Sequence, residues 1–80
     1  MKYTETEIKV ISIVSNSLNV KNIDLQSSQD NTQAWDSFGY LSIICAIEEE
    51  FAIDISQENI NSFGSVQNIL IAINNSWLIL

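Results

Sequence analysis

Apolar residues recur at three- and four-residue steps in three separate segments of this chain, and this spacing limits the possible fold more than any other feature. Such spacing gives an α-helix one apolar face, whereas a half-buried strand would alternate at every second residue. The stripe residues are Val10, Ile11, Val14 and Leu18 in the first segment, Leu41, Ile43, Ile44, Ile47 and Phe51 in the second, and Val66, Ile69, Leu70 and Ile73 in the third. The pattern predicts three amphipathic helices.

Capping signals set the expected limits of these helices. Thr4 and Glu7 have the spacing of a capping box, in which each side chain satisfies the other's backbone amide, so we expect the first helix over residues 4–16. The second helix is expected over about 37–51 and the last one after Ser65. Between them, a short helical segment over 57–62 is expected, with Ser56 as its N-cap.

Residues 17–36 are rich in Ser, Asn, Asp and Gln and show no sustained period, which predicts a long connection. We expect Val20, Ile23 and Leu25 to anchor this connection against the helices, and the apolar tail over 76–80 to pack back on them. A chain of 80 residues is one domain at most. Residues 1–80 are therefore predicted to form a single all-α domain, a small helical bundle of three main helices plus one short helix.

The charges are distributed unevenly along the chain. All three basic residues (Lys2, Lys9 and Lys21) lie in the first 21 positions, whereas eight of the ten acids follow them. An acidic surface repels nucleic-acid phosphates and anionic lipids, so we expect neither nucleic acid nor membrane as a partner. It favours a protein partner with a basic patch, although the same acids would also serve solubility alone.

The residue types present exclude several kinds of chemistry. The chain has no histidine and one cysteine, Cys45, so Ser-His-Asp and Cys-His catalysis and Cys/His zinc sites are excluded. No glycine-rich phosphate loop or EF-hand spacing occurs. We therefore predict that the protein is not an enzyme. A single cysteine fits a reducing compartment, and Glu5 and Glu7 interrupt any secretory signal, so we expect a cytoplasmic protein.

The second predicted helix has unusual residues at both ends. Acids near a helix C-terminus cost about 0.3–1 kcal/mol each, yet this helix ends on Glu48, Glu49 and Glu50. At its start, Ser37 has no base to activate it, but its hydroxyl could accept a group attached by another enzyme. A phosphodiester there would lie at a helix N-terminus, which favours anions. The alternatives are that Ser37 only caps the helix and that the glutamates only aid solubility.

Asp36-Ser37-Phe38-Gly39, followed by an apolar helix and the segment AIEEEFAIDI, resembles the acyl carrier proteins. In that family an Asp-Ser-Leu-like motif begins the second helix, and a Leu-Glu-Glu-Glu-Phe-like segment ends it. The likeness covers almost the whole chain, from the capped first helix to the last helix, which opens at SVQNI. It implies the acyl-carrier-protein fold and a non-enzymatic carrier. The Trp-Asp-Ser form is similar to that of free-standing carriers of specialised biosynthetic pathways.

The resemblance also implies roles for individual residues. Ser37 matches the serine that receives 4'-phosphopantetheine from coenzyme A, and Asp36 matches the acid that helps to engage the magnesium-dependent phosphopantetheinyl transferase. The thiol of the arm then holds an acyl group as a thioester for acyl-loading and acyl-transfer enzymes with basic docking patches. The residues that match partner-facing positions are Phe38, Cys45, Glu48, Glu49 and Glu50.

Other positions depart from the family pattern or leave alternatives open. Gly39 and Ser42 stand where the family often carries further acids, which favours a dedicated set of partners. We expect Trp35 to pack the connection onto the bundle and Cys45 to be a buried or half-buried small hydrophobe. An aminoacyl or peptidyl carrier is one alternative function, although QAW lacks the glycines usual before the serine. An unmodified docking adaptor is another, although it would not need the Ser37 hydroxyl. We expect a monomer, and the sequence does not name the cargo.

Overall fold

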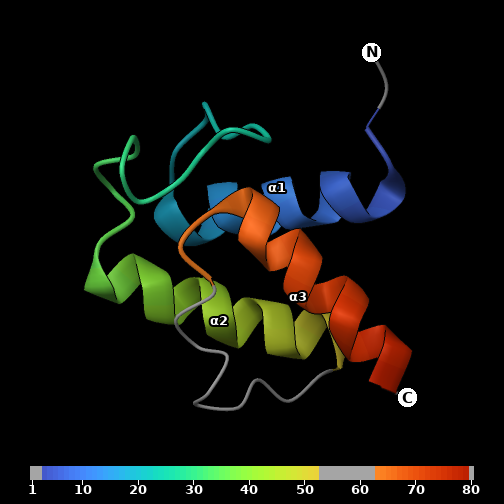
Figure 1. Cartoon of the computed structure of the whole chain (residues 1–80). Coiled ribbons are helices and arrows are strands. Elements are labelled where there is room, and N and C mark those ends of the chain that lie inside the picture. The colour runs from blue at the N-terminus through green and yellow to red at the C-terminus, as the bar shows by residue number, and fades with distance from the viewer. Residues whose placement is uncertain (1–2, 53–62, 80) are drawn as a thin grey trace.

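The structure is a computed structural model that describes the backbone of residues 3–52 and 63–79 and the side chains of residues 3–52 and 63–74. This part of the chain forms three helices and no strand: α1 (Glu5–Leu18), α2 (Ser37–Phe51) and α3 (Val66–Ile79). Figure 1 shows α1 and α2 running side by side with α3 crossing them, and α1 contacts both other helices. The predicted all-α bundle is confirmed. The short helix expected over 57–62, its cap Ser56 and the side chains of the tail lie outside the described residues.

The predicted capping box starts α1. The Glu7 amide donates to Thr4 Oγ1 at 3.1 Å, and the Thr4 amide donates to Glu7 Oε1 at 2.8 Å. The helix continues two residues past the predicted end, to Leu18, because Leu18 is itself a core residue. It then stops at Asn19, whose φ of 55° is left-handed, a conformation that asparagine tolerates better than most residues.

The core lies where the three helices and the long connection meet. Trp35 is only 3% exposed, so the predicted packing of this residue is confirmed. The connection is anchored by Val20, Ile23 and Leu25, which are partly buried against the core, also as predicted. The buried hydrophobic residues are Val10, Val14, Leu18, Trp35, Ile43, Ile44, Ile47, Phe63, Val66, Ile69 and Ile73. Phe63, just before α3, belongs to no predicted stripe but is among the most completely buried side chains.

The buried face of α2 is rotated from the predicted one. Leu41 was expected inside but is 56% exposed, so that part of the predicted stripe is wrong. Gly39, Ile43 and Ile47, four residues apart, form the centre of the buried face. At about 100° per residue, Leu41 lies roughly 200° around the helix from Ile43, which places it toward solvent.

The long connection is bonded to the start of α3. The Gln29 amide donates to the Gly64 carbonyl oxygen at 2.9 Å, and the Val66 amide donates to the Ser27 carbonyl oxygen at 3.0 Å. The Gln67 side chain also donates to the Leu25 carbonyl oxygen, at 3.1 Å. These bonds between distant segments give the backbone of the connection partners that a helix or strand would otherwise supply.

Candidate functional site

Ser37 is the first residue of α2, but it is not the cap. The cap is Asp36, whose Oδ1 accepts the Gly39 amide at 2.9 Å while its backbone stays extended. The Ser37 side chain is exposed, and its hydroxyl makes no hydrogen bond within the described residues. The interpretation that Ser37 serves only as an N-cap is therefore wrong, because its neighbour does that work.

The backbone around Ser37 is held by close packing at Gly39. A Cβ on Gly39 would overlap Leu18 Cδ2 and lie 2.8 Å from the Ala34 carbonyl oxygen. The end of α1 and the end of the connection thus press directly on the first turn of α2. This contact fixes the place of Ser37 relative to the bundle. It also means that an acid at position 39 would not fit here without a backbone shift.

Replacing Gly39 with alanine is expected to destabilise the protein by about 1–2 kcal/mol. Overpacking costs about 1–3 kcal/mol, and the better helix propensity of alanine returns at most about 1 kcal/mol. The free energy of unfolding in urea measures the effect. Ser42→Ala, at an exposed position of the same helix, is the matched control and should change little. Equal stability of the Gly39→Ala protein and the wild type would show that this contact is not tight.

An exposed apolar stripe runs along α2 from Ser37. Phe38 is 85% exposed and Leu41 56% exposed, and Cys45 is also exposed. Steps of three and four residues place these three side chains on one helix face. The expectation that Cys45 is buried or half-buried is wrong, since it lies, like Leu41, two residues from Ile43 on the side away from the core. Leu41 was not predicted to belong to this surface. Knowing which face of α2 is buried would have placed Leu41 on the exposed side.

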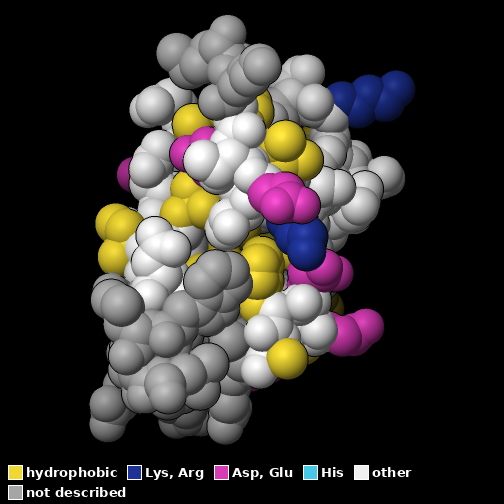
Figure 2. Space-filling view, turned by 90° about the vertical axis from the view of Figure 1, so that its right-hand side faces the viewer, with side chains coloured by type: hydrophobic (Ala, Val, Ile, Leu, Met, Phe, Trp, Pro, Cys, Tyr) yellow, Lys and Arg dark blue, Asp and Glu magenta, His cyan; other side chains and the backbone are white. Residues whose placement is uncertain are grey.

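The three glutamates at the end of α2 are not equivalent. Glu48 is half-buried, whereas Glu49 is exposed and has no partner within the described residues. Glu50 forms an ion pair with Lys9 of α1, with 3.5 Å between Lys9 Nζ and Glu50 Oε2. Figure 2 shows a face of the molecule on which a basic side chain lies directly against acidic ones. Pairing reduces the charge that Glu50 presents to a partner, so Glu49 is the most available acid of the three.

The described residues offer neither a metal-binding cluster nor a membrane-spanning helix. No group of three or more His, Cys, Asp or Glu side chains there could hold a metal ion. None of the helices in the same part of the chain has the length and apolar character needed to cross a membrane.

Known proteins give one informative comparison. No protein-family model matches the chain. The chain is similar to the acyl carrier protein of Buchnera aphidicola subsp. Schizaphis graminum (strain Sg), with 39% identity over 72 residues. The match covers 86% of this chain and 90% of that protein. The similarity is therefore not confined to the motif around Ser37 but extends over most of both chains.

Proposed function

Because the chain belongs to the acyl carrier protein family, we propose that it carries acyl intermediates as thioesters on a 4'-phosphopantetheine arm attached to Ser37. Members of this family are carriers and not enzymes. The observation that carries the assignment of the site is the Ser37 hydroxyl, which is exposed and unbonded within the described residues while Asp36 caps the helix. The carrier would present its cargo to the enzymes of a specialised pathway, as a monomer in the cytoplasm.

The surroundings of Ser37 fit a phosphodiester. The Gly39 amide bonds to the Asp36 side chain, and the Tyr40 amide donates to the Asp36 carbonyl oxygen at 2.8 Å. This leaves the amides of Ser37 and Phe38 without a hydrogen bond in the described residues, at the helix end whose dipole favours negative charge. The bound arm would supply a terminal thiol. The protein itself would hold the attachment oxygen at an exposed and rigid helix terminus.

A docking surface for partner enzymes would begin next to Ser37. We assign to it the exposed apolar side chains of Phe38, Leu41 and Cys45, followed by the acids Glu48 and Glu49 about one turn beyond Cys45. A matching partner would have an apolar pocket bordered by basic residues. Glu50 belongs to the same helix end, but its ion pair with Lys9 limits its contribution. Gly39 is buried, so acidic contacts are concentrated at the far end of the helix.

The chemical form of the cargo provides the test of this function. Incubation with an acyl-coenzyme A, magnesium and a broad-specificity transferase should add one acylated arm to the intact mass. Neutral hydroxylamine should then remove the acyl group and leave the arm, because it cleaves thioesters. A Cys45→Ser variant is the control, since the exposed Cys45 thiol could itself take up an acyl group. Acylation that requires Cys45, or that never appears, would contradict the proposed function.

Two substitutions at Asp36 should separate its capping role from its role toward the transferase. Asp36→Asn keeps a capping oxygen and is expected to change stability by about 0.5 kcal/mol or less, whereas Asp36→Ala should cost about 0.5–2 kcal/mol. Both should lower kcat/KM for arm transfer by roughly fivefold or more, the effect of about 1 kcal/mol in the transition state. Urea unfolding and a mass-based rate assay measure the two effects. Normal transfer to Asp36→Asn would show that the carboxylate charge serves the helix alone.

A further inference from the structure

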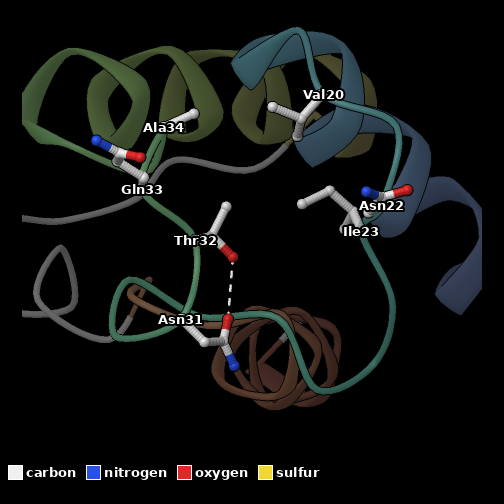
Figure 3. Close-up of a pocket in the computed structure, with 7 residues that line it drawn as sticks. All are labelled: Val20, Asn22, Ile23, Asn31, Thr32, Gln33 and Ala34. Atoms are coloured by element: carbon white, nitrogen blue, oxygen red, sulfur yellow. Dashed lines mark hydrogen bonds between the residues drawn. The ribbon is translucent and has the colours of Figure 1, made fainter.

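The long connection borders an open hollow of about 510 Å³, whose lining includes Ala34, three residues before Ser37. Figure 3 shows that two limbs of the connection border it, one over residues 20–23 and the other over residues 31–34. The second limb runs directly into Asp36 and Ser37. The residues that line the hollow are Val20, Asn22, Ile23, Asn31, Thr32, Gln33 and Ala34.

All the side chains that line this hollow are uncharged. Val20, Ile23 and Ala34 provide an apolar surface that is continuous with the core. The remaining lining side chains are amides and one hydroxyl. Such a surface suits an uncharged ligand with aliphatic groups and amides, and it offers no cationic side chain to a phosphate or a carboxylate.

The polar groups of the hollow differ in whether they are already bonded. Asn31 already makes three hydrogen bonds: its Oδ1 accepts the Ser28 amide at 2.9 Å and the Thr32 hydroxyl at 3.0 Å, and its Nδ2 donates to the Gln26 carbonyl oxygen at 2.9 Å. The Asn22 and Gln33 side chains, by contrast, make no hydrogen bond within the described residues. Figure 3 shows these two amides on opposite sides of the opening. The rim therefore holds two side-chain amides that make no hydrogen bond within the described residues, and each can donate and accept.

We propose that this hollow is the resting site of the pantetheine portion of the arm on Ser37, an inference that rests on the proposed function. Beyond its phosphate, the arm is uncharged and contains a geminal dimethyl group, a hydroxyl and two amides. The dimethyl group matches the aliphatic surface of Val20 and Ile23, and the amides match the side chains of Asn22 and Gln33. The other lining residues need not contact the arm.

Reach to the limb over residues 31–34 and tethering both favour this site. Ala34 precedes Ser37 by three residues, so their Cα atoms are at most about 11 Å apart, and an arm of roughly fourteen bonds extends about 16 Å at the same distance per bond. Attachment at Ser37 gives the arm an effective concentration in the millimolar range. A hollow with only millimolar intrinsic affinity would thus be occupied for a large fraction of the time.

Nuclear Overhauser effects between arm and protein test the inference directly. Protein labelled with ¹³C and ¹⁵N is loaded with an unlabelled arm from coenzyme A, and isotope-filtered spectra are recorded under reducing conditions. We expect contacts from the arm methyl groups to the methyl groups of Val20, Ile23 and Ala34. Amide shifts should also change over residues 20–23 and 31–34 when the unloaded and loaded proteins are compared.

Asn22→Ala is the test variant, because Asn22 is exposed and distant from Ser37 in the sequence. Losing one hydrogen bond should lower the ratio of docked to free arm by about two- to tenfold. The intact mass should still show that every chain carries the arm. Asn16→Ala, an exposed amide on α1, is the matched control and should keep the wild-type contacts. Complete loading with arm contacts absent from the hollow, or unchanged in Asn22→Ala, overturns this inference alone. Failure of the wild type to gain the arm overturns the proposed function as well.

Discussion

Ser37→Ala is expected to abolish attachment of the arm while leaving the fold intact. The hydroxyl oxygen is the atom to which the arm would be joined, so removing it leaves no acceptor at this helix terminus. The substitution should affect attachment without affecting the helix cap, because the capping hydrogen bond runs from the Gly39 amide to Asp36 and does not involve Ser37. Stability should therefore change by only about 0.5 kcal/mol, as for an exposed surface position. Intact mass reports loading, and urea unfolding reports the fold.

Ser42→Ala provides the matched control for this prediction. Ser42 is also an exposed serine of α2, so its loss removes an equivalent hydroxyl from the same helix. It should load to completion under conditions in which Ser37→Ala shows no gain in mass. Loading of both variants would place the attachment at another residue.

Reversing the charge of Glu48 and Glu49 to lysine is expected to slow association with a partner that has a basic patch by about tenfold or more at low salt. Electrostatic steering changes association rates by about 10- to 1,000-fold, and this double substitution turns attraction into repulsion at one end of α2. The effect should shrink at physiological ionic strength, where the screening length is about 8 Å. Measuring kcat/KM for arm transfer at two salt concentrations gives both the loss caused by the charge reversal and the dependence of that loss on salt.

The control for this charge reversal is Glu5→Lys with Asp30→Lys, which changes the net charge equally at exposed positions outside α2. If both double variants slow transfer to the same degree, total charge is what the transferase responds to. A salt-independent loss only in Glu48→Lys with Glu49→Lys would instead point to a packing defect, because Glu48 is half-buried. If Glu48 and Glu49 guide docking, kcat/KM should fall only in the α2 double variant, and added salt should make that fall smaller.

The starts of the helices were predictable because local signals determine them. The Thr4–Glu7 capping box and the Asp36-Ser37 start are short-range features, and the predicted limits of α2 agree with the structure. The identity of the cap was less clear, since aspartate and serine are about equally good in that position. Only the observed bond from the Gly39 amide to Asp36 decides between the two residues.

The phase of the buried face of α2 could not be predicted from local sequence. Apolar residues lie on most sides of this helix, so periodicity alone allows more than one buried face. The contact of Gly39 with Leu18 and Ala34 selects the observed one. Because Leu18 lies far from Gly39 in the sequence, local periodicity could not reveal this contact, and Leu41 was expected inside and Cys45 at most half exposed.

Long-range contacts also created features that no motif indicated. The ion pair of Lys9 with Glu50 joins α1 to the end of α2, and it distinguishes Glu50 from the other two glutamates. The hollow depends on the course of the connection, which the bond from the Gln29 amide to the Gly64 carbonyl oxygen helps to hold. Sequence patterns predict that such a connection exists, but its shape follows from pairings between segments far apart in the chain.

Mapping the attachment site by mass spectrometry tests the central claim most directly. Wild-type protein is incubated with coenzyme A, magnesium and a broad-specificity phosphopantetheinyl transferase, and the loaded chain is fragmented to locate the added mass. We expect one phosphopantetheine per chain, on the fragment that contains Ser37 and on no other. An unchanged mass with a transferase that loads a known carrier in the same assay, or an arm located on any other residue, would contradict the assignment of Ser37 as the attachment site.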